Sequence, residues 1–183
     1  MSRIFQFTTD RLIHLTIILT GFCTMMSQIA LLKELVIVFA GNELTLGFML
    51  GVWLLGTALG SGILGRFGSR SKHPHIIFMI LLLCFSFLVP ISAVGVRLSA
   101  GFWGIQQGEL LGLLPVVFIP LMTLFPIALL AGMLYTVGCY VFNLFTKEPA
   151  TSVSKIYLFE AIGSGIASFL FSLFLIRILD NFV

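Results

Sequence analysis

Long apolar runs, separated by short polar stretches, dominate the sequence and predict membrane-spanning helices. We expect six spans, at about residues 12–39, 44–65, 76–97, 110–126, 127–145 and 156–178. A helix of about 17–25 predominantly apolar residues crosses the roughly 30 Å hydrocarbon core of a bilayer. The predicted fold is therefore all-α, a polytopic helix bundle that forms one integral membrane domain over residues 1–183.

The fourth and fifth spans depend on the division of one long apolar block. The block from Leu110 to Phe145 contains no charged residue and three prolines. As a single helix it would be about 54 Å long, which exceeds the thickness of one bilayer. Proline interrupts helical hydrogen bonding, so we divide the block near Pro126. Without that division the chain has five spans.

The basic residues favour a cytoplasmic N-terminus, because Lys and Arg collect on the inner side of a membrane. Six spans place Arg3, Arg11, Arg66, Arg70, Lys72 and Arg177 inside. Five spans would move Lys147 and Lys155 inside as well, which fits the same rule slightly better. Both arrangements keep the N-terminus inside.

The composition excludes several classes of protein. Hydrophobic residues make up 59% of the chain and charged residues 9%, against about 25% charged residues in soluble domains. The net charge of +3 is small and dispersed, so we expect no nucleic-acid surface. The three cysteines have no ligand spacing, and only His14 among the histidines lies in a span. We expect no catalytic residues, no cofactor and no metal.

Small residues recur at four-residue spacing in the second span. Such spacing places them on one side of a helix, where another backbone can approach closely in lipid. The residues are Gly47 and Gly51, Gly56 and Gly60, and Ser61 and Gly65. The polar turn before this span contains Asn42 and Glu43, and a carboxylate at a helix start suits the helix dipole. The first two spans thus predict a membrane hairpin.

The first span carries a polar stripe formed by Thr16, Thr20, Thr24, Ser27, Gln28 and Glu34. Two interpretations are open. The stripe either lines a cavity, or its hydroxyl groups bond back to carbonyls of their own helix and pack. Lys33 points to nearly the opposite side, where its long side chain can reach the membrane interface.

The last span carries a second stripe, with Glu160, Ser164, Ser168 and Ser172 at four-residue steps. Small residues at this spacing favour tight helix packing. Glu160 is either an interfacial carboxylate or a buried proton or cation site, or it pairs with Lys33 or Arg97. It is the intramembrane residue that we consider most informative.

Several short motifs resemble those of one known family. They are Gln28-Ile29, Leu32-Lys33-Glu34-Leu35, Gly41-Asn42-Glu43-Leu44, Trp53-Leu54, Gly60-Ser61, Gly65-Arg66, Gly108-Glu109, Phe125-Pro126 and the run from Tyr157 to Gly165. In these motifs the chain resembles the N-terminal membrane domain of bacterial membrane-bound spermidine synthase-like proteins, also described as fused major-facilitator/spermidine synthase proteins. The resemblance implies a half-facilitator-like bundle in the bacterial inner (cytoplasmic) membrane. Those proteins carry a soluble synthase-like domain after the last span, and these 183 residues do not include one, so we do not assign synthase activity from the resemblance.

Two functions follow as predictions. The first is a non-catalytic integral membrane subunit that anchors or completes a larger complex, with the lipid bilayer and other protein subunits as its partners. The alternative is a small-molecule or ion permease that acts as an oligomer. The stripes that contain Gln28, Glu34 and Glu160 discriminate between the two, because only a permease needs them to face a passage.

Overall fold

The computed structural model describes residues 2–39, 43–102, 113–146 and 149–175. Nearly all of these residues are helical, and no strand occurs among them. The all-α prediction is therefore confirmed for the described part of the chain. Parts of the expected spans fall outside it, namely residues 110–112 and 176–178, as do Lys147 and Arg177.

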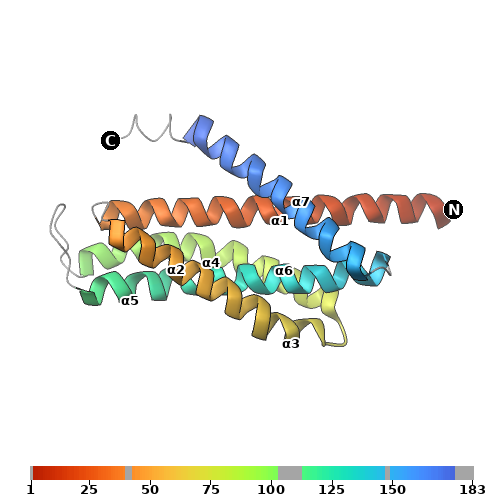
Figure 1. Cartoon of the computed structure of the whole chain (residues 1–183), viewed down its shortest axis with the longest axis horizontal. Helices are drawn as coiled ribbons and strands as arrows, with labels where there is room; N and C mark the ends of the chain where they lie inside the picture. Colours follow the sequence, from red (N-terminus) through yellow and green to blue (C-terminus); the bar gives the residue numbers. More distant parts are fainter. Residues whose placement is uncertain (1, 40–42, 103–112, 147–148, 176–183) are drawn as a thin grey trace. The chain divides into compact units, whose positions relative to one another are not determined.

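Seven α-helices and two π-helical segments follow one another along the described chain (Figure 1). In order they are α1 (Ser2–Val38), α2 (Glu43–Leu59), η1 (Gly60–Leu64), α3 (Gly65–Ser69), α4 (Pro74–Phe102), α5 (Leu113–Thr123), α6 (Phe125–Thr146), α7 (Pro149–Leu170) and η2 (Phe171–Leu175). The segments η1 and η2 continue α2 and α7 directly.

Five helical stretches in the described residues are long and apolar enough to cross a membrane. They are Arg11–Val38, Thr45–Ser69, Pro74–Ser99, Leu114–Phe145 and Val153–Leu173. The prediction of six spans is not confirmed. The alternative of five matches these helices, and the difference lies in the block that we divided near Pro126.

That block continues as a helix through the junction of α5 and α6. The N–H of Leu124 donates to the carbonyl of Pro120 at 2.8 Å, and the N–H of Ala128 donates to the carbonyl of Leu124 at 3.0 Å. Pro126 is the second residue of α6, and in a first turn the missing N–H of proline is tolerated. The proline is therefore accommodated without a reversal of the chain.

The chain divides into two compact units, one formed by Met1–Ser27 and Gly138–Val183 and the other by Gln28–Val137. Helices α1 and α6 contribute residues to both. We describe the two units separately.

The unit Gln28–Val137 contains most of the fully buried side chains. Within it α4 and α5 lie side by side, and α2 contacts α5 (Figure 1). Its interior is mainly apolar and includes Leu31, Leu35, Met49, Val96, Leu124, Ile127, Leu134 and Val137. Thr45, Ser92 and Thr123 are buried as well.

In the unit Met1–Ser27 with Gly138–Val183, α7 crosses α1 at an angle (Figure 1). Its buried apolar residues are Ile17, Phe142, Ile156, Ala167 and Phe171. Two polar residues of α1, Thr24 and Ser27, are buried as well.

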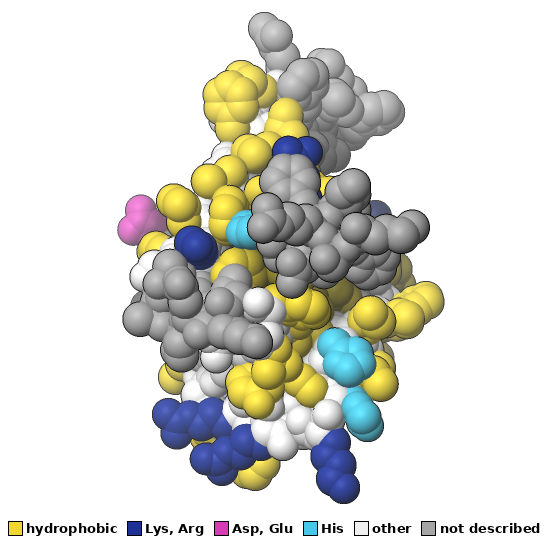
Figure 2. Space-filling view, turned by 90° about the vertical axis from the view of Figure 1, so that its right-hand side faces the viewer, with side chains coloured by type: hydrophobic (Ala, Val, Ile, Leu, Met, Phe, Trp, Pro, Cys, Tyr) yellow, Lys and Arg dark blue, Asp and Glu magenta, His cyan; other side chains and the backbone are white. Residues whose placement is uncertain are grey.

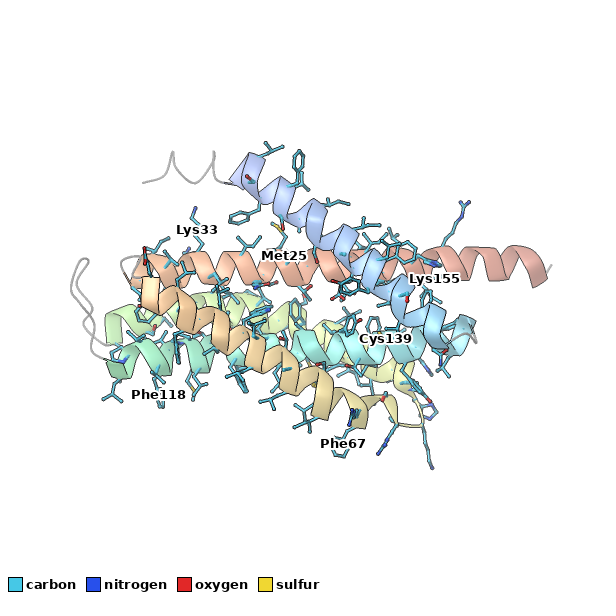
Figure 3. All side chains as sticks on the ribbon, viewed as in Figure 1. Met25, Lys33, Phe67, Phe118, Cys139 and Lys155 are labelled. Atoms are coloured by element: carbon cyan, nitrogen blue, oxygen red, sulfur yellow. The ribbon has the colours of Figure 1, made fainter. Side chains whose placement is uncertain are left out.

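Large apolar side chains are exposed along every spanning stretch. Leu54 is 67% exposed, Phe87 is 64% exposed and Phe169 is 64% exposed. Phe67 and Phe118 point outward from their helices (Figure 3). Water would penalise so much exposed apolar surface, whereas lipid tails accept it. The exposure pattern is compatible with a multi-pass membrane protein.

Candidate functional site

The hydroxyl groups on the first polar stripe bond to carbonyls of their own helix. Thr16 donates to the carbonyl of Leu12 at 2.8 Å and Thr20 donates to that of Thr16 at 2.8 Å. Thr24 donates to the carbonyl of Gly21 at 3.0 Å, and Ser27 donates to the carbonyl of Cys23 at 2.7 Å. Of the two interpretations of this stripe, the geometry favours local bonding and packing over the lining of a cavity. Gln28 is half-buried.

Glu34 forms an ion pair with Arg97. The Nε of Arg97 donates to Oε2 of Glu34 at 2.9 Å, and Nη2 donates to Oε1 at 2.5 Å. This two-pronged geometry is the strongest arrangement of guanidinium and carboxylate. The pair joins the C-terminal part of α1 to the C-terminal part of α4. From the sequence we considered Arg97 as a partner of Glu160, but in the structure Arg97 pairs with Glu34. Lys33 projects outward from α1 (Figure 3).

The start of α2 carries the next predicted residues. Glu43 is the first residue of α2 and is exposed, so its carboxylate lies where the helix dipole favours negative charge. Asn42 lies outside the described residues.

The glycine pairs along α2 and the start of η1 differ in what they contact. A Cβ on Gly56 would lie 2.7 Å from the Cβ of Ala128, and one on Gly60 would overlap the carbonyl oxygen of Leu129. These two glycines therefore allow α2 to approach the backbone of α6 closely. No atom lies within 4 Å of a Cβ on Gly47 or Gly51, so the expected close approach is not found there within the described chain.

Helix α6 supplies matching small residues to this contact. A Cβ on Gly132 would overlap the carbonyl oxygen of Thr57 and lie 2.8 Å from the N of Ser61. Thr136 donates a hydrogen bond to the carbonyl of Ser61 at 3.0 Å. We call the contact formed by Gly56, Gly60, Gly132 and Thr136 the α2–α6 seam. Alanine, glycine and threonine at 128, 132 and 136 repeat every four residues, a signal that our sequence interpretation missed.

The π-helical segment η1 brings Gly65 onto the same side as Gly60. The N–H of Gly65 bonds to the carbonyl of Gly60, five residues earlier, where an α-helix would bond four residues earlier. A Cβ on Gly65 would lie 2.6 Å from the Cβ of Thr136. The wider turn thereby keeps α3 packed along α6.

The crossing of α1 and α7 forms a second close contact. A Cβ on Gly21 would overlap the carbonyl oxygen of Glu160, and one on Gly163 would overlap that of Ile18. Ser164 donates to the carbonyl of Gly21 at 3.2 Å, across the two helices. We call this the α1–α7 crossing. Gly21 was not among the predicted residues, because no small residue precedes or follows it at four-residue spacing.

Glu160 lies at this crossing and is half-buried. Neither a hydrogen bond nor an ion pair of its carboxylate occurs within the described residues. Further along α7, Ser168 bonds to the carbonyl of Ser164 at 2.9 Å, and Ser172 is exposed. Within the described part of the second stripe, Ser164 bonds to another helix, Ser168 bonds within α7, and the carboxylate of Glu160 has no partner.

Aromatic rings surround the single intramembrane histidine. His14 lies edge-on to Phe159 at 4.5 Å and to Phe142 at 5.2 Å between ring centroids. The next residue on α6, Asn143, has a buried Oδ1 with no hydrogen-bond partner in the described structure. The described residues contain no group of three side chains that could hold a metal ion.

Comparisons with models of protein families, with characterised proteins and with solved structures found no match to this chain. The resemblance to spermidine synthase-like membrane domains and the half-facilitator arrangement therefore stay predictions.

Proposed function

We propose that this chain is a non-catalytic integral membrane subunit that anchors or completes a larger membrane complex. The main support is that the hydroxyl groups of its polar stripe and the charges of Glu34 and Arg97 are engaged inside the chain. The hydroxyl groups of α1 bond to their own helix, and Glu34 is held by Arg97. A transport pathway needs such groups free to meet a solute, whereas a structural subunit does not.

The open glycines of α2 supply a second support. Gly47 and Gly51 have the spacing that lets transmembrane helices approach closely, yet within the described residues no other part of the chain packs against them. A helix of another subunit would fit there. We propose the bacterial inner membrane as the location, with the N-terminus in the cytoplasm. With five spans, the inner side then receives Arg11, Arg66, Arg70, Lys72 and Lys155, in agreement with the positive-inside rule.

The test is purification of the tagged full chain from native membranes in mild detergent, with mass spectrometry of the copurifying proteins. We expect a partner in fixed ratio that is lost from the variant with Gly47→Leu and Gly51→Leu. Gly101→Leu is the matched control, because that exposed glycine also has open space but lies on α4. A chain that purifies alone, or the same partner on all variants, would contradict the proposal.

The alternative function, an oligomeric small-molecule or ion permease, has one observation in its favour. Glu160 places a half-buried carboxylate inside a spanning stretch without a described partner, which is typical of proton and cation sites. In vesicles reconstituted with the full chain, a permease would lose proton or cation flux in Glu160→Gln and keep it in Glu43→Gln. A structural subunit would give no flux above that of empty vesicles in any variant.

A further inference from the structure

The turn between α3 and α4 concentrates positive charge at one end of its unit. Arg66, Arg70 and Lys72 are exposed there, together with His73 and His75. We call these five residues the basic turn. In the space-filling view, Lys and Arg side chains gather beside two histidines toward the lower end of the face shown (Figure 2).

No acidic residue of the described unit neutralises the basic turn. The sequence contains no Asp or Glu between Glu43 and Glu109. Glu34 is already paired with Arg97, and Glu43 lies at the start of α2, the end remote from the turn. Within the described part of this unit the positive charge of the basic turn is therefore uncompensated, and such charge attracts an anion.

Exposed apolar side chains flank the basic turn on both helices. Phe67 is 71% exposed and points outward (Figure 3), and Met79 on α4 is 65% exposed. The turn joins the spanning stretches Thr45–Ser69 and Pro74–Ser99. Apolar surface that suits acyl chains thus lies directly beside cationic groups at the level of the lipid headgroups.

The backbone of the turn is held in a defined conformation. The N–H of Arg70 donates to the carbonyl of Arg66 at 3.3 Å, and the N–H groups of Ile76 and Ile77 donate to the carbonyl of His73 at 3.1 and 3.2 Å. Helix α4 begins at this turn, and the helix formed by α2, η1 and α3 ends there, so the opposite ends of the two helix dipoles offset each other. The positive charge of the basic turn therefore comes from its side chains.

We propose that the basic turn binds the phosphate of an anionic phospholipid, whose acyl chains lie along the exposed apolar side chains beside Phe67 and Met79. Arg66 and Arg70 offer the forked N–H donors that match phosphate oxygens. The charge complementarity and the adjacent apolar surface together select a lipid over a soluble phosphate. The site gives the protein a preference among the lipids that surround it.

The size of the effect follows from the number of cations. Each Lys or Arg near an anionic membrane surface contributes roughly fivefold to binding, so removal of three lowers the preference on the order of 100-fold. The test uses the full chain in nanodiscs of phosphatidylcholine with a minor share of phosphatidylglycerol. Native mass spectrometry then measures which lipid stays bound after transfer to detergent.

We expect the wild-type chain to retain phosphatidylglycerol preferentially, and the variant with Arg66→Gln, Arg70→Gln and Lys72→Gln to lose the preference. The matched control carries Lys33→Gln and Lys155→Gln, two cations outside the basic turn, and should behave as the wild type. Equal retention by the wild type and the triple variant would overturn the proposal. Displacement of the lipid by inorganic phosphate, under conditions in which chloride at the same ionic strength leaves the lipid bound, would also overturn it, in favour of a site for soluble phosphate.

A salt titration of the wild-type chain keeps the test decisive should the triple variant fail to fold. Retention of phosphatidylglycerol should fall as salt rises, because exposed charges are screened. Retention independent of salt would show that the headgroup charge is not what the protein binds, and would refute the proposal.

Discussion

Replacement of Gly60 by alanine would force apart the two helices of the α2–α6 seam. The added Cβ would overlap the carbonyl oxygen of Leu129 and lie 2.9 Å from its carbonyl carbon and 3.1 Å from its Cα. Ordinary contacts of a Cβ begin near 3.4 Å. Backbone atoms cannot rotate away as the end of a flexible side chain can, so the helices must separate.

The magnitude follows from two opposed effects. Overpacking of a close contact destabilises by about 1–3 kcal/mol. Alanine is favoured over glycine in a helix by roughly 1 kcal/mol, which offsets part of that loss. Gly62→Ala is the matched control, because Gly62 lies in the same π-helical segment, is exposed and has no atom within 4 Å of its added Cβ. The difference between the two variants cancels the helix preference and should be about 1–3 kcal/mol.

The assay is unfolding of the full chain in mixed micelles by increasing fractions of denaturing detergent. It is followed by tryptophan fluorescence, to which the buried Trp53 contributes. Gly132→Ala should be destabilising as well, and the double variant should lose less than the sum, because one separation relieves both overlaps. Equal unfolding free energies for Gly60→Ala and Gly62→Ala would refute the close approach of α2 and α6.

Two further predictions use other contacts, and a third concerns the number of spans. Ser164→Ala removes the bond across the α1–α7 crossing and should cost about 0.6 kcal/mol, while Ser168→Ala, which removes a bond within α7, should cost less in the same unfolding assay; the reverse order would argue against the crossing. Glu34→Gln and Arg97→Gln should each lower the midpoint of thermal unfolding, and the swapped pair Glu34→Arg with Arg97→Glu should recover it; a swap no better than the singles would speak against the ion pair. The last prediction concerns topology and uses Lys155→Cys in a chain whose native cysteines are replaced. With five spans, the new cysteine should be labelled from the same side of the membrane as an N-terminal tag. Labelling from the opposite side would support six spans.

The sequence predicts the helices better than their number. Apolar runs of membrane length identify spanning helices without any knowledge of the neighbours, so the all-α fold could be derived directly. The division at Pro126 is not confirmed, because composition reveals a proline but not its position within a helix. In a first turn the missing N–H is tolerated, and the chain continues.

Spacing of small residues identifies a helix side but not its partner. Gly47 and Gly51 have the same spacing as Gly56 and Gly60, yet only the second pair meets α6 within the described chain. What distinguishes them is the position of Gly132, which depends on how α6 lies against α2. That arrangement is a tertiary property, and no local pattern encodes it.

The ion pair of Glu34 and Arg97 illustrates the same limit for charges. The two residues are 63 positions apart, and each by itself is an ordinary charge near the end of an apolar run. Their meeting follows from α1 and α4 ending at the same level of one unit. The sequence suggested Arg97 as a partner for Glu160, because both lie in spans and carry opposite charges.

The wide turn at Gly60–Leu64 has a consequence for every experiment that scans this region residue by residue. Exposed neighbours recur in steps of four, at Leu54 and Leu55, then at 58 and 59, 62 and 63, and 66 and 67. An ordinary helix repeats every 3.6 residues and would drift out of phase over that distance, but the one extra residue in η1 absorbs the drift. Spin-label or cysteine accessibility through residues 54–67 should therefore oscillate with a period of four, and a wheel diagram drawn at 100° per residue would assign the wrong side to Arg66 and Phe67.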